Sequence, residues 1–248
     1  MILRAFALAL QLLTRLPVPS PAAPPRPEEL GLSVLFFPVV GLLIGALLAG
    51  LHTTLWLIDP GVLAAGGLGV GVFRPGGWLL GGRAAPADAW IGGHGDRDRT
   101  LAIMKDPRSG PMAVVIIVLV LLTKFAALQV LLAGDARTVL LLAPVLGRSV
   151  IVLLLATTPY VRPEGLGAAY ADYLPRLSCA TLVLLVALAT VGLLDWQGGV
   201  LLGVLAGGFF GMRHWLLNRL GGTTGDTLGA ACELAETVAL LVPALLVE

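Results

Sequence analysis

The sequence predicts an all-α, polytopic integral membrane protein with about six or seven transmembrane helices. Of its 248 residues, 57% are hydrophobic and 12% are charged, whereas soluble domains are roughly 45–50% apolar and about 25% charged. Several apolar runs also reach the roughly 20 residues that a helix needs to cross a bilayer. The charged residues gather in a few blocks between these runs. We therefore expect one membrane domain over residues 1–248, with the lipid bilayer as its surroundings.

The N-terminal segment predicts an interfacial helix within residues 1–19. Its beginning, MILRAFALALQLLTRLPVP, superficially resembles a signal peptide. However, Arg15 directly follows the apolar run, and no small-residue cleavage site comes after it. We interpret the segment as a retained amphipathic helix that ends at Pro17 and Pro19.

Five longer apolar runs are the clearest membrane spans, at residues 33–58, 112–133, 138–158, 179–194 and 199–217. Residues 61–73 are short and rich in glycine, and residues 238–247 are expected to finish the chain as a half-span. Gly41 and Gly45 have GxxxG spacing, which lets a neighbouring helix approach closely.

Charge and cysteine content exclude several classes of function. Lys and Arg number 16 and Asp and Glu number 15, so the overall charge does not favour nucleic acid as a partner. Cys179 and Cys232 lie in apolar or helical surroundings, and their spacing does not match a zinc site. We therefore expect both cysteines to act as small buried side chains.

Two polar blocks, residues 82–109 and 221–236, are expected to form an active face on the cytoplasmic side. Arginine and lysine near span ends favour the cytoplasm, and Arg97, Lys105 and Arg219 lie in or beside these blocks. We expect the two blocks to meet on one face. Lys105 and Arg108 should point toward it, about one turn apart if this stretch is helical.

The block at residues 221–236 reads GGTTGDTLGAACELAE. Its glycines permit a tight turn and close approach of a ligand, and Thr223 or Thr224 is suited to cap the following helix.

In a helix that starts near Asp226, that residue and Glu233 lie two turns apart on one face, and Glu236 lies one turn further. Carboxylates at membrane depth are costly unless they face a cavity, a metal or a cation. Beside a glycine turn they suit a divalent cation that holds a pyrophosphate. The alternative is a solvated helix start, where acids interact favourably with the helix dipole.

Four segments together resemble the cobalamin synthase family, the adenosylcobinamide-GDP ribazoletransferases. They are TRLPVP at 14–19, FFPVVGLLIG at 36–45, IMKDPRSG at 103–110 and the GGTTGD segment. The resemblance runs along nearly the whole chain in the expected order. It implies an enzyme of the bacterial inner membrane that performs the last assembly step of vitamin B12.

The resemblance also implies the reaction and its residues. The hydroxyl of α-ribazole, or of its 5′-phosphate, attacks the phosphate carried by cobinamide in adenosylcobinamide-GDP. GMP leaves, and Mg²⁺ is the cofactor. A homo-oligomer is a further expectation. Phosphoryl transfer needs metal ions and cations that spread charge. The implied catalytic residues are Asp88, Lys105, Asp106, Arg108 and Asp226; the substrate-binding residues are Gly221, Gly222, Thr224, Gly225 and Arg148; the metal ligands are Asp88, Asp226 and Glu233. For Arg148, a snorkelling arginine at a span end is an equally good interpretation.

One segment departs from the family pattern. Family members carry Thr-Gly-Gly-x-His-Leu-Asp-Gly-Leu-Ala-Asp-x-x-Asp, where this chain reads PGGWLLGGRAAPAD at 75–88. Leu79 stands in place of the histidine, and Gly81 and Ala85 stand in place of two aspartates. Fewer carboxylates should weaken Mg²⁺ binding. Three interpretations remain open: an inactive copy, a sequence error or frameshift confined to about 71–86, and a divergent enzyme that uses Asp88, Asp96 and the C-terminal acids.

Two other functions compete with this resemblance. A membrane transporter would also have many apolar spans and intramembrane acids, but the sequence shows no internal repeat of the kind common in transporters. A CDP-alcohol phosphotransferase acting on lipid would need its own aspartate-rich motif, of which Asp88 alone remains.

Overall fold

The computed structural model describes residues 1–18, 24–54, 59–73, 85–106, 108, 110–134 and 137–247, with residues 69–73 as backbone only. Within these ranges the chain is helical, and its strand-like pairing is a single isolated bridge between Tyr160 and Thr223. The prediction of an all-α membrane protein is confirmed. Leu79 and Gly81 lie outside the described residues.

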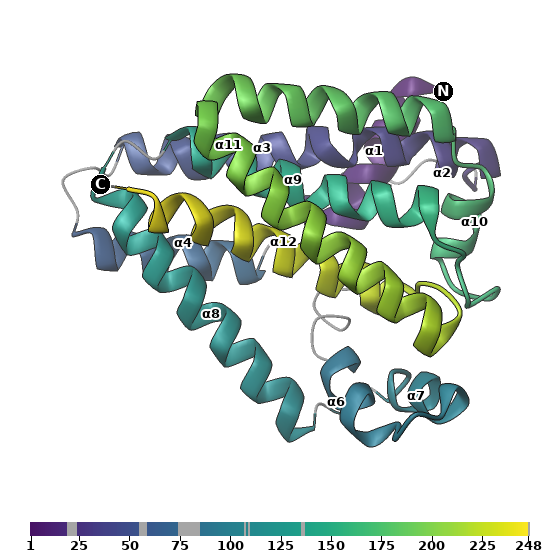
Figure 1. Ribbon diagram of the computed structural model, residues 1–248. Coiled ribbons are helices and arrows are strands. Elements are labelled where there is room, and N and C mark those ends of the chain that lie inside the picture. Colours follow the sequence, from purple (N-terminus) through teal and green to yellow (C-terminus); the bar gives the residue numbers. More distant parts are fainter. Residues whose placement is uncertain are drawn as a thin grey trace.

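The described helices follow one another along the chain (Figure 1). They are α1 (Ile2–Leu13), α2 (Pro27–Ser33), the 3₁₀ turn η1 (Val34–Phe36), α3 (Phe37–Thr54), α4 (Pro60–Phe73), α6 (Ala85–Gly92), α7 (Arg97–Ile103), α8 (Pro111–Leu132), α9 (Arg137–Thr157), α10 (Gly167–Asp172), α11 (Arg176–Leu220) and α12 (Gly225–Leu245).

Five helical stretches in the described residues are long and apolar enough to cross a membrane: Pro27–Thr54, α8, α9, α11 and α12. With 45 residues, α11 would be about 68 Å long if straight, more than twice the thickness of the hydrocarbon core. Asp195 breaks it with a non-helical φ of 50° and ψ of −132°. A Cβ at Gly198 would lie only 2.6 Å from the Thr190 carbonyl oxygen, so the two halves fold back on each other. Counting the two halves separately gives six crossing segments among the described residues, within the predicted six or seven.

Helix α9 is the centre of the bundle, with α3, α11 and α12 around it (Figure 1). Most of its side chains are buried. The GxxxG pair packs α3 against it: a Cβ at Gly41 would lie 2.5 Å from the Pro144 oxygen, and one at Gly45 would lie 2.5 Å from the Leu141 oxygen. Close helix packing is therefore the role of these two glycines.

Two helix boundaries differ from the sequence prediction. The apolar run 238–247 is not a separate half-span, because α12 continues unbroken from Gly225 to Leu245. Small side chains such as Ala231 and Ala235 keep its inner face buried through the segment that carries the acids. Helix α1 ends at Leu13, before the prolines. Thr14 is extended there, and its hydroxyl donates a hydrogen bond to the Leu10 oxygen.

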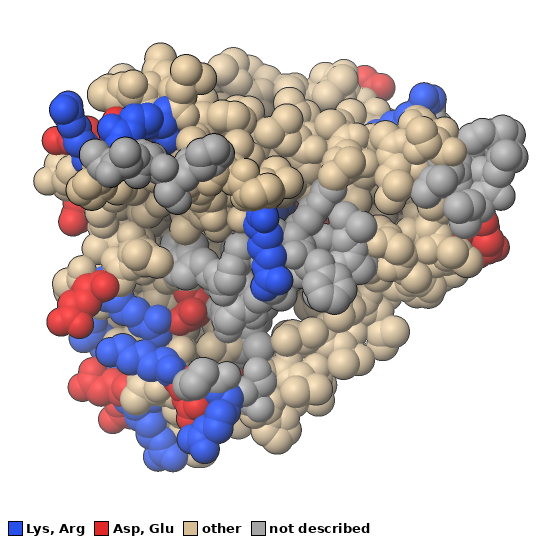
Figure 2. Space-filling model, turned by 180° about the vertical axis from the view of Figure 1, so that it is seen from behind, with Lys and Arg blue, Asp and Glu red and all other residues tan. Residues whose placement is uncertain are grey.

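Charged side chains collect at one end of the molecule. Figure 2 shows Lys, Arg, Asp and Glu gathered over α6 and α7, whereas most of the visible surface elsewhere is uncharged. In Figure 1, α6 and α7 lie beside the N-terminal end of α8 and below the C-terminal end of α11. The polar end of the bundle is therefore formed by helix ends and by these two short helices.

Candidate functional site

The Gly221–Asp226 turn connects α11 to α12 and needs glycine at its start. Gly221 has a left-handed φ of 75°, and its N–H donates to the Leu217 oxygen, which ends α11. A Cβ at Gly222 would lie 2.2 Å from the Pro159 oxygen. Glycine therefore lets this turn lie directly on the loop that follows α9. Thr223 N donates to the Pro159 oxygen at 2.7 Å, and Val161 N donates to the Thr223 oxygen at 2.9 Å.

Thr224 caps α12, as one of the two predicted threonines. Its hydroxyl accepts a hydrogen bond from Thr227 N at 3.3 Å, and the Thr227 hydroxyl accepts one from Thr224 N at 2.9 Å. Both side chains and that of Thr223 are fully buried. The buried Thr224 side chain therefore supports the turn, and its substrate-binding role stays a prediction.

Helices α6 and α7 meet the turn, as expected for the two polar blocks. Arg97 Nε donates to the Leu220 oxygen at 2.8 Å, across 123 residues of sequence. Trp90 on α6 stacks on Trp215 of α11, with ring centroids 4.4 Å apart and an angle of 9° between the planes. Asp96 starts α7 by accepting a hydrogen bond from Arg99 N at 2.8 Å. The first two contacts place α6 and α7 against the end of α11, directly before the Gly221 turn, and α6 also touches α12.

Asp226 forms an ion pair with Arg162 rather than facing Glu233. The Arg162 Nη1 donates to Asp226 Oδ2 at 2.6 Å, and the side chains are 19% and 17% exposed. Arg162 was not among the predicted site residues, although it lies in a polar stretch between two spans. The position of Arg162 in the sequence could have indicated this role. Arg162 lies in the connection between α9 and α11, and this connection is at the same end of the bundle as the turn.

Tyr160 packs behind this ion pair. Burial raises the pKa of its hydroxyl, and contacts with the backbone N–H groups of Gly167 and Gly225 act in the opposite direction. A Cβ at Gly167 would lie 2.5 Å from the tyrosine ring. Tyr160 therefore links the loop that carries Arg162 to the first residue of α12.

Asp88 caps the N-terminus of α8 from outside that helix. Its carboxylate accepts hydrogen bonds from Gly110 N at 2.6 Å and from Ala113 N at 3.0 Å. These are N–H groups at the start of the helix, which attract negative charge. Asp88 thus lies on the polar end of the bundle, but its oxygens face backbone donors.

Lys105, Asp106 and Arg108 follow α7 in an exposed loop. Arg108 Nη2 donates to Asp106 Oδ2 at 2.8 Å. This side-chain hydrogen bond, followed by the one from the Arg108 backbone, lowers the pKa of Asp106 to about 2. The expected helical spacing of Lys105 and Arg108 is wrong, because α7 ends at Ile103 in a tight turn in which Asp106 N donates to the Ile103 oxygen.

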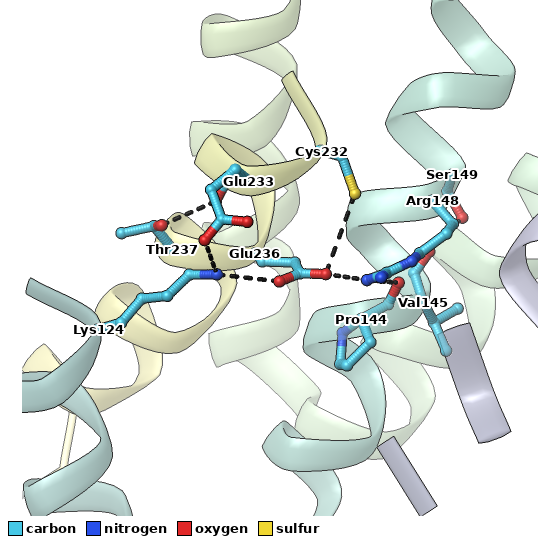
Figure 3. A network of polar contacts seen from close by, with 9 residues as sticks. All are labelled: Lys124, Pro144, Val145, Arg148, Ser149, Cys232, Glu233, Glu236 and Thr237. Carbon is cyan, nitrogen blue, oxygen red and sulfur yellow. Dashed lines mark hydrogen bonds and ion pairs between the residues drawn. The ribbon is translucent and has the colours of Figure 1, made fainter. Parts of the chain in front are cut away.

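Glu233 and Arg148 belong to a buried network of four charges, which we call the membrane quartet: Lys124, Arg148, Glu233 and Glu236 (Figure 3). Lys124 Nζ lies 2.6 Å from Glu233 Oε1 and 2.9 Å from Glu236 Oε2. Arg148 Nη1 pairs with the other oxygen of Glu236. The four formal charges cancel, as buried charges require. Arg148 is 4% exposed, so it does not snorkel. Its partner Glu236 lies ten residues beyond Asp226 along α12, about 15 Å further along the helix axis.

The three predicted metal ligands do not converge. Asp88 faces the α8 N-terminus, Asp226 faces Arg162, and Glu233 faces Lys124. Among the residues that the structure describes, no three His, Cys, Asp or Glu side chains are grouped to hold a metal ion. Asp88, Asp226 and Glu233 therefore do not fit a shared Mg²⁺ site in this arrangement.

Comparisons with known proteins agree with the resemblance seen in the motifs. An adenosylcobinamide-GDP ribazoletransferase of Pseudomonas syringae pv. syringae is 52% identical over 241 residues, covering 97% of this chain and 99% of the relative. One of Ectopseudomonas mendocina is 52% identical over 238 residues, covering 96% and 97%. One of Pseudomonas putida strain F1 is 49% identical, covering 95% and 96%. No solved structure matches the chain significantly.

The family described as Cobalamin-5-phosphate synthase matches residues 5–244, which include the buried bundle and both segments of the polar face. Because this family model matches and the relatives are about 50% identical over nearly their whole length, the chain belongs to the cobalamin-5-phosphate synthase family.

Proposed function

We propose that the protein transfers adenosylcobinamide phosphate from adenosylcobinamide-GDP to α-ribazole or its 5′-phosphate and releases GMP. Family membership and the names of its relatives support this reaction. In it, a ribazole hydroxyl oxygen forms a bond to the phosphorus nearest cobinamide. The bond from that phosphorus to the oxygen bridging it to GMP breaks, and the hydroxyl proton is lost.

The observation that carries the proposal is that two arginines from other parts of the chain meet the two ends of the glycine turn. Arg97 reaches the Leu220 carbonyl oxygen directly before the glycine turn, and Arg162 reaches Asp226 directly after it. Cations on both sides of a glycine turn suit a substrate with two linked phosphates, because phosphoryl transfer depends on positioning and on stabilising negative charge. We propose that the exposed Gly221 offers its backbone to the substrate, that the buried Gly222 and Gly225 shape the turn beneath it, and that Asp226 is the essential carboxylate of this face.

Mg²⁺ remains a proposed cofactor that rests on the resemblance. The dispersed positions of Asp88, Asp226 and Glu233 argue against a metal held by these three residues together. The catalytic roles proposed for Lys105, Asp106 and Arg108 likewise rest on the motif. Their exposed loop lies on the same polar end as the turn.

We further propose that the polar face is cytoplasmic and that the membrane is the bacterial plasma membrane. Arg97 and Arg99 lie on α7, Lys105 lies in the loop after it, and Arg219 lies at the adjoining end of α11, whereas the opposite end of the bundle carries the exposed Asp195 at the α11 kink. An excess of lysine and arginine near span ends favours the cytoplasmic side. Association of several copies of the chain into a homo-oligomer is a separate proposal, which the structure of the single chain does not address.

The reaction is tested with purified protein in detergent. Adenosylcobinamide-GDP and Mg²⁺ are supplied with and without α-ribazole phosphate, and GMP is measured by chromatography. We expect GMP release that requires the ribazole and that accompanies an equal amount of corrinoid product. GMP release that is independent of ribazole would indicate hydrolysis and would contradict the proposed transfer.

A further inference from the structure

Arg162 has hydrogen-bond donors that the folded protein does not use. A guanidinium carries five N–H donors. Nη1 donates to Asp226, but Nε and Nη2 are buried without a hydrogen-bond partner in the part of the chain that the structure describes. Leaving buried donors unpaired is unfavourable, particularly for a charged group. The arrangement therefore favours a ligand that supplies acceptor oxygens.

The position of Arg162 is fixed by the glycine turn. Val161 pairs with Thr223 through the backbone, and its side chain would lie 2.7 Å from a Cβ at Gly222. On the other side of the turn, a Cβ at Gly221 would lie 3.9 Å from Arg97 Nε. The guanidinium thus stands beside the segment that the family motif marks as the substrate site.

Other cations fit this role less well. Arg108 is bound through several hydrogen bonds to Asp106 in an exposed loop, and Arg148 is part of the membrane quartet. Arg97 already uses Nε on the Leu220 oxygen. Arg162 combines substantial burial with unused donors and one edge, 19% of the side chain, that remains exposed.

We propose that Arg162 binds the diphosphate group of the nucleotide-linked substrate and that Asp226 is the positioning residue that orients its guanidinium. The planar guanidinium suits two phosphate oxygens at once, while Nη1 keeps its contact with Asp226. Lysine has a single ammonium and lacks this planar fork, so it replaces arginine incompletely. The loop 160–166 is half-buried to exposed, and the proposal requires that it shifts on binding to open the inner donors to the phosphates. This inference rests on the proposed function and names the residue that holds the substrate.

The test measures the affinity of the detergent-purified full chain for inorganic pyrophosphate, without Mg²⁺, by titration calorimetry. We expect Arg162→Gln to weaken binding about tenfold or more, since hydrogen bonds to charged groups are the strongest of their class. Arg162→Lys should bind with intermediate affinity. Arg176→Gln is the matched control: its guanidinium donates to the Ala156 oxygen at an exposed helix end, and its affinity should stay within about twofold of the unmodified chain.

Asp226→Asn separates orientation from metal binding. The Asn amide oxygen can still accept the hydrogen bond from Arg162 Nη1, so the guanidinium stays oriented. Without Mg²⁺ the substitution removes a negative charge beside the phosphates, so pyrophosphate should bind as tightly as before or more tightly. In the GMP-release assay, Arg162→Lys should raise KM for adenosylcobinamide-GDP by a larger factor than it lowers kcat.

Equal pyrophosphate affinity of Arg162→Gln and the unmodified chain would overturn the inference, as would a lack of pyrophosphate binding by the unmodified chain. If Arg162→Gln does not fold, unchanged affinity of the folded Arg162→Lys protein would overturn it. These outcomes leave the proposed function standing as long as ribazole-dependent GMP release persists. If the unmodified chain binds pyrophosphate normally but releases no GMP, the proposed reaction is contradicted and the proposed anion site at Arg162 is retained.

Discussion

Removal of the lysine from the membrane quartet should destabilise the protein strongly. In Lys124→Met, the side-chain volume is nearly kept, but Glu233 and Glu236 lose an ammonium at 2.6 and 2.9 Å. Arg148 alone then faces two carboxylates, and one net negative charge stays buried. Breaking a buried ion pair by removing one partner costs about 3–5 kcal/mol.

This loss should be visible as a lower melting temperature. For chains of this size, 1 kcal/mol corresponds to about 2–4 °C, so Lys124→Met should lower Tm by roughly 6–20 °C. Neither cysteine forms a disulfide and both are buried, and a thiol-reactive fluorophore therefore reports unfolding of the protein in detergent. Because detergent unfolding is commonly irreversible, all variants are compared at one scan rate.

A second substitution identifies the cause as charge. In Lys124→Met/Glu233→Gln the remaining pair, Arg148 and Glu236, is neutral again, so the double variant should recover more than half of the lost Tm. A single variant within about 2 °C of the unmodified chain would refute the reasoning. A double variant that is no more stable than the single one would show that shape, not charge, decides stability at this position.

Three further predictions concern packing, helix capping and the altered segment. Gly45→Ala should lower stability by about 1–3 kcal/mol, because its Cβ would lie 2.5 Å from the Leu141 oxygen, whereas Gly203→Ala, with open space around it, should be neutral or stabilising in the same melting assay. Asp88→Ala should lower stability by about 1–2 kcal/mol and increase hydrogen exchange at the start of α8, since Gly110 N and Ala113 N lose their acceptor; unchanged exchange there would contradict the capping role. In the GMP assay, the triple variant Leu79→His/Gly81→Asp/Ala85→Asp, which restores the family residues together, should raise the rate of GMP release by orders of magnitude. A rate equal to that of the unmodified chain would show that these three positions are dispensable.

Much of the fold follows from the sequence because crossing a bilayer imposes length and hydrophobicity. The apolar runs mark α8, α9 and both halves of α11 within a few residues of their ends. Even the kink at Asp195 corresponds to the polar interruption between two runs. The continuity of α12 was not predicted, because its first half is polar in composition and its burial depends on contacts with α9.

The site is harder to predict, because ion pairing depends on which helices become neighbours. The helical period correctly puts Asp226 and Glu233 on similar faces, but they are about 10 Å apart along the axis. Each therefore finds a different cation: Arg162 in the loop after α9, and Lys124 in the middle of α8. The motif predicted the glycine turn and Asp226, whereas the roles of Arg162 and Lys124 become visible only once α8, α9 and α12 are packed together.

The most direct measurement compares ribazole-dependent GMP release by the unmodified chain, Asp226→Asn and Asp195→Asn. Asp226 lies at the glycine turn, and Asp195 is an exposed acid at the kink in the middle of α11, at the far end of the bundle. If transfer occurs at the polar face, Asp226→Asn should lower the rate about 100-fold or more, and Asp195→Asn should stay within about twofold of the unmodified chain. An equal effect of the two substitutions, or no ribazole-dependent GMP from the unmodified chain, would contradict catalysis at this face.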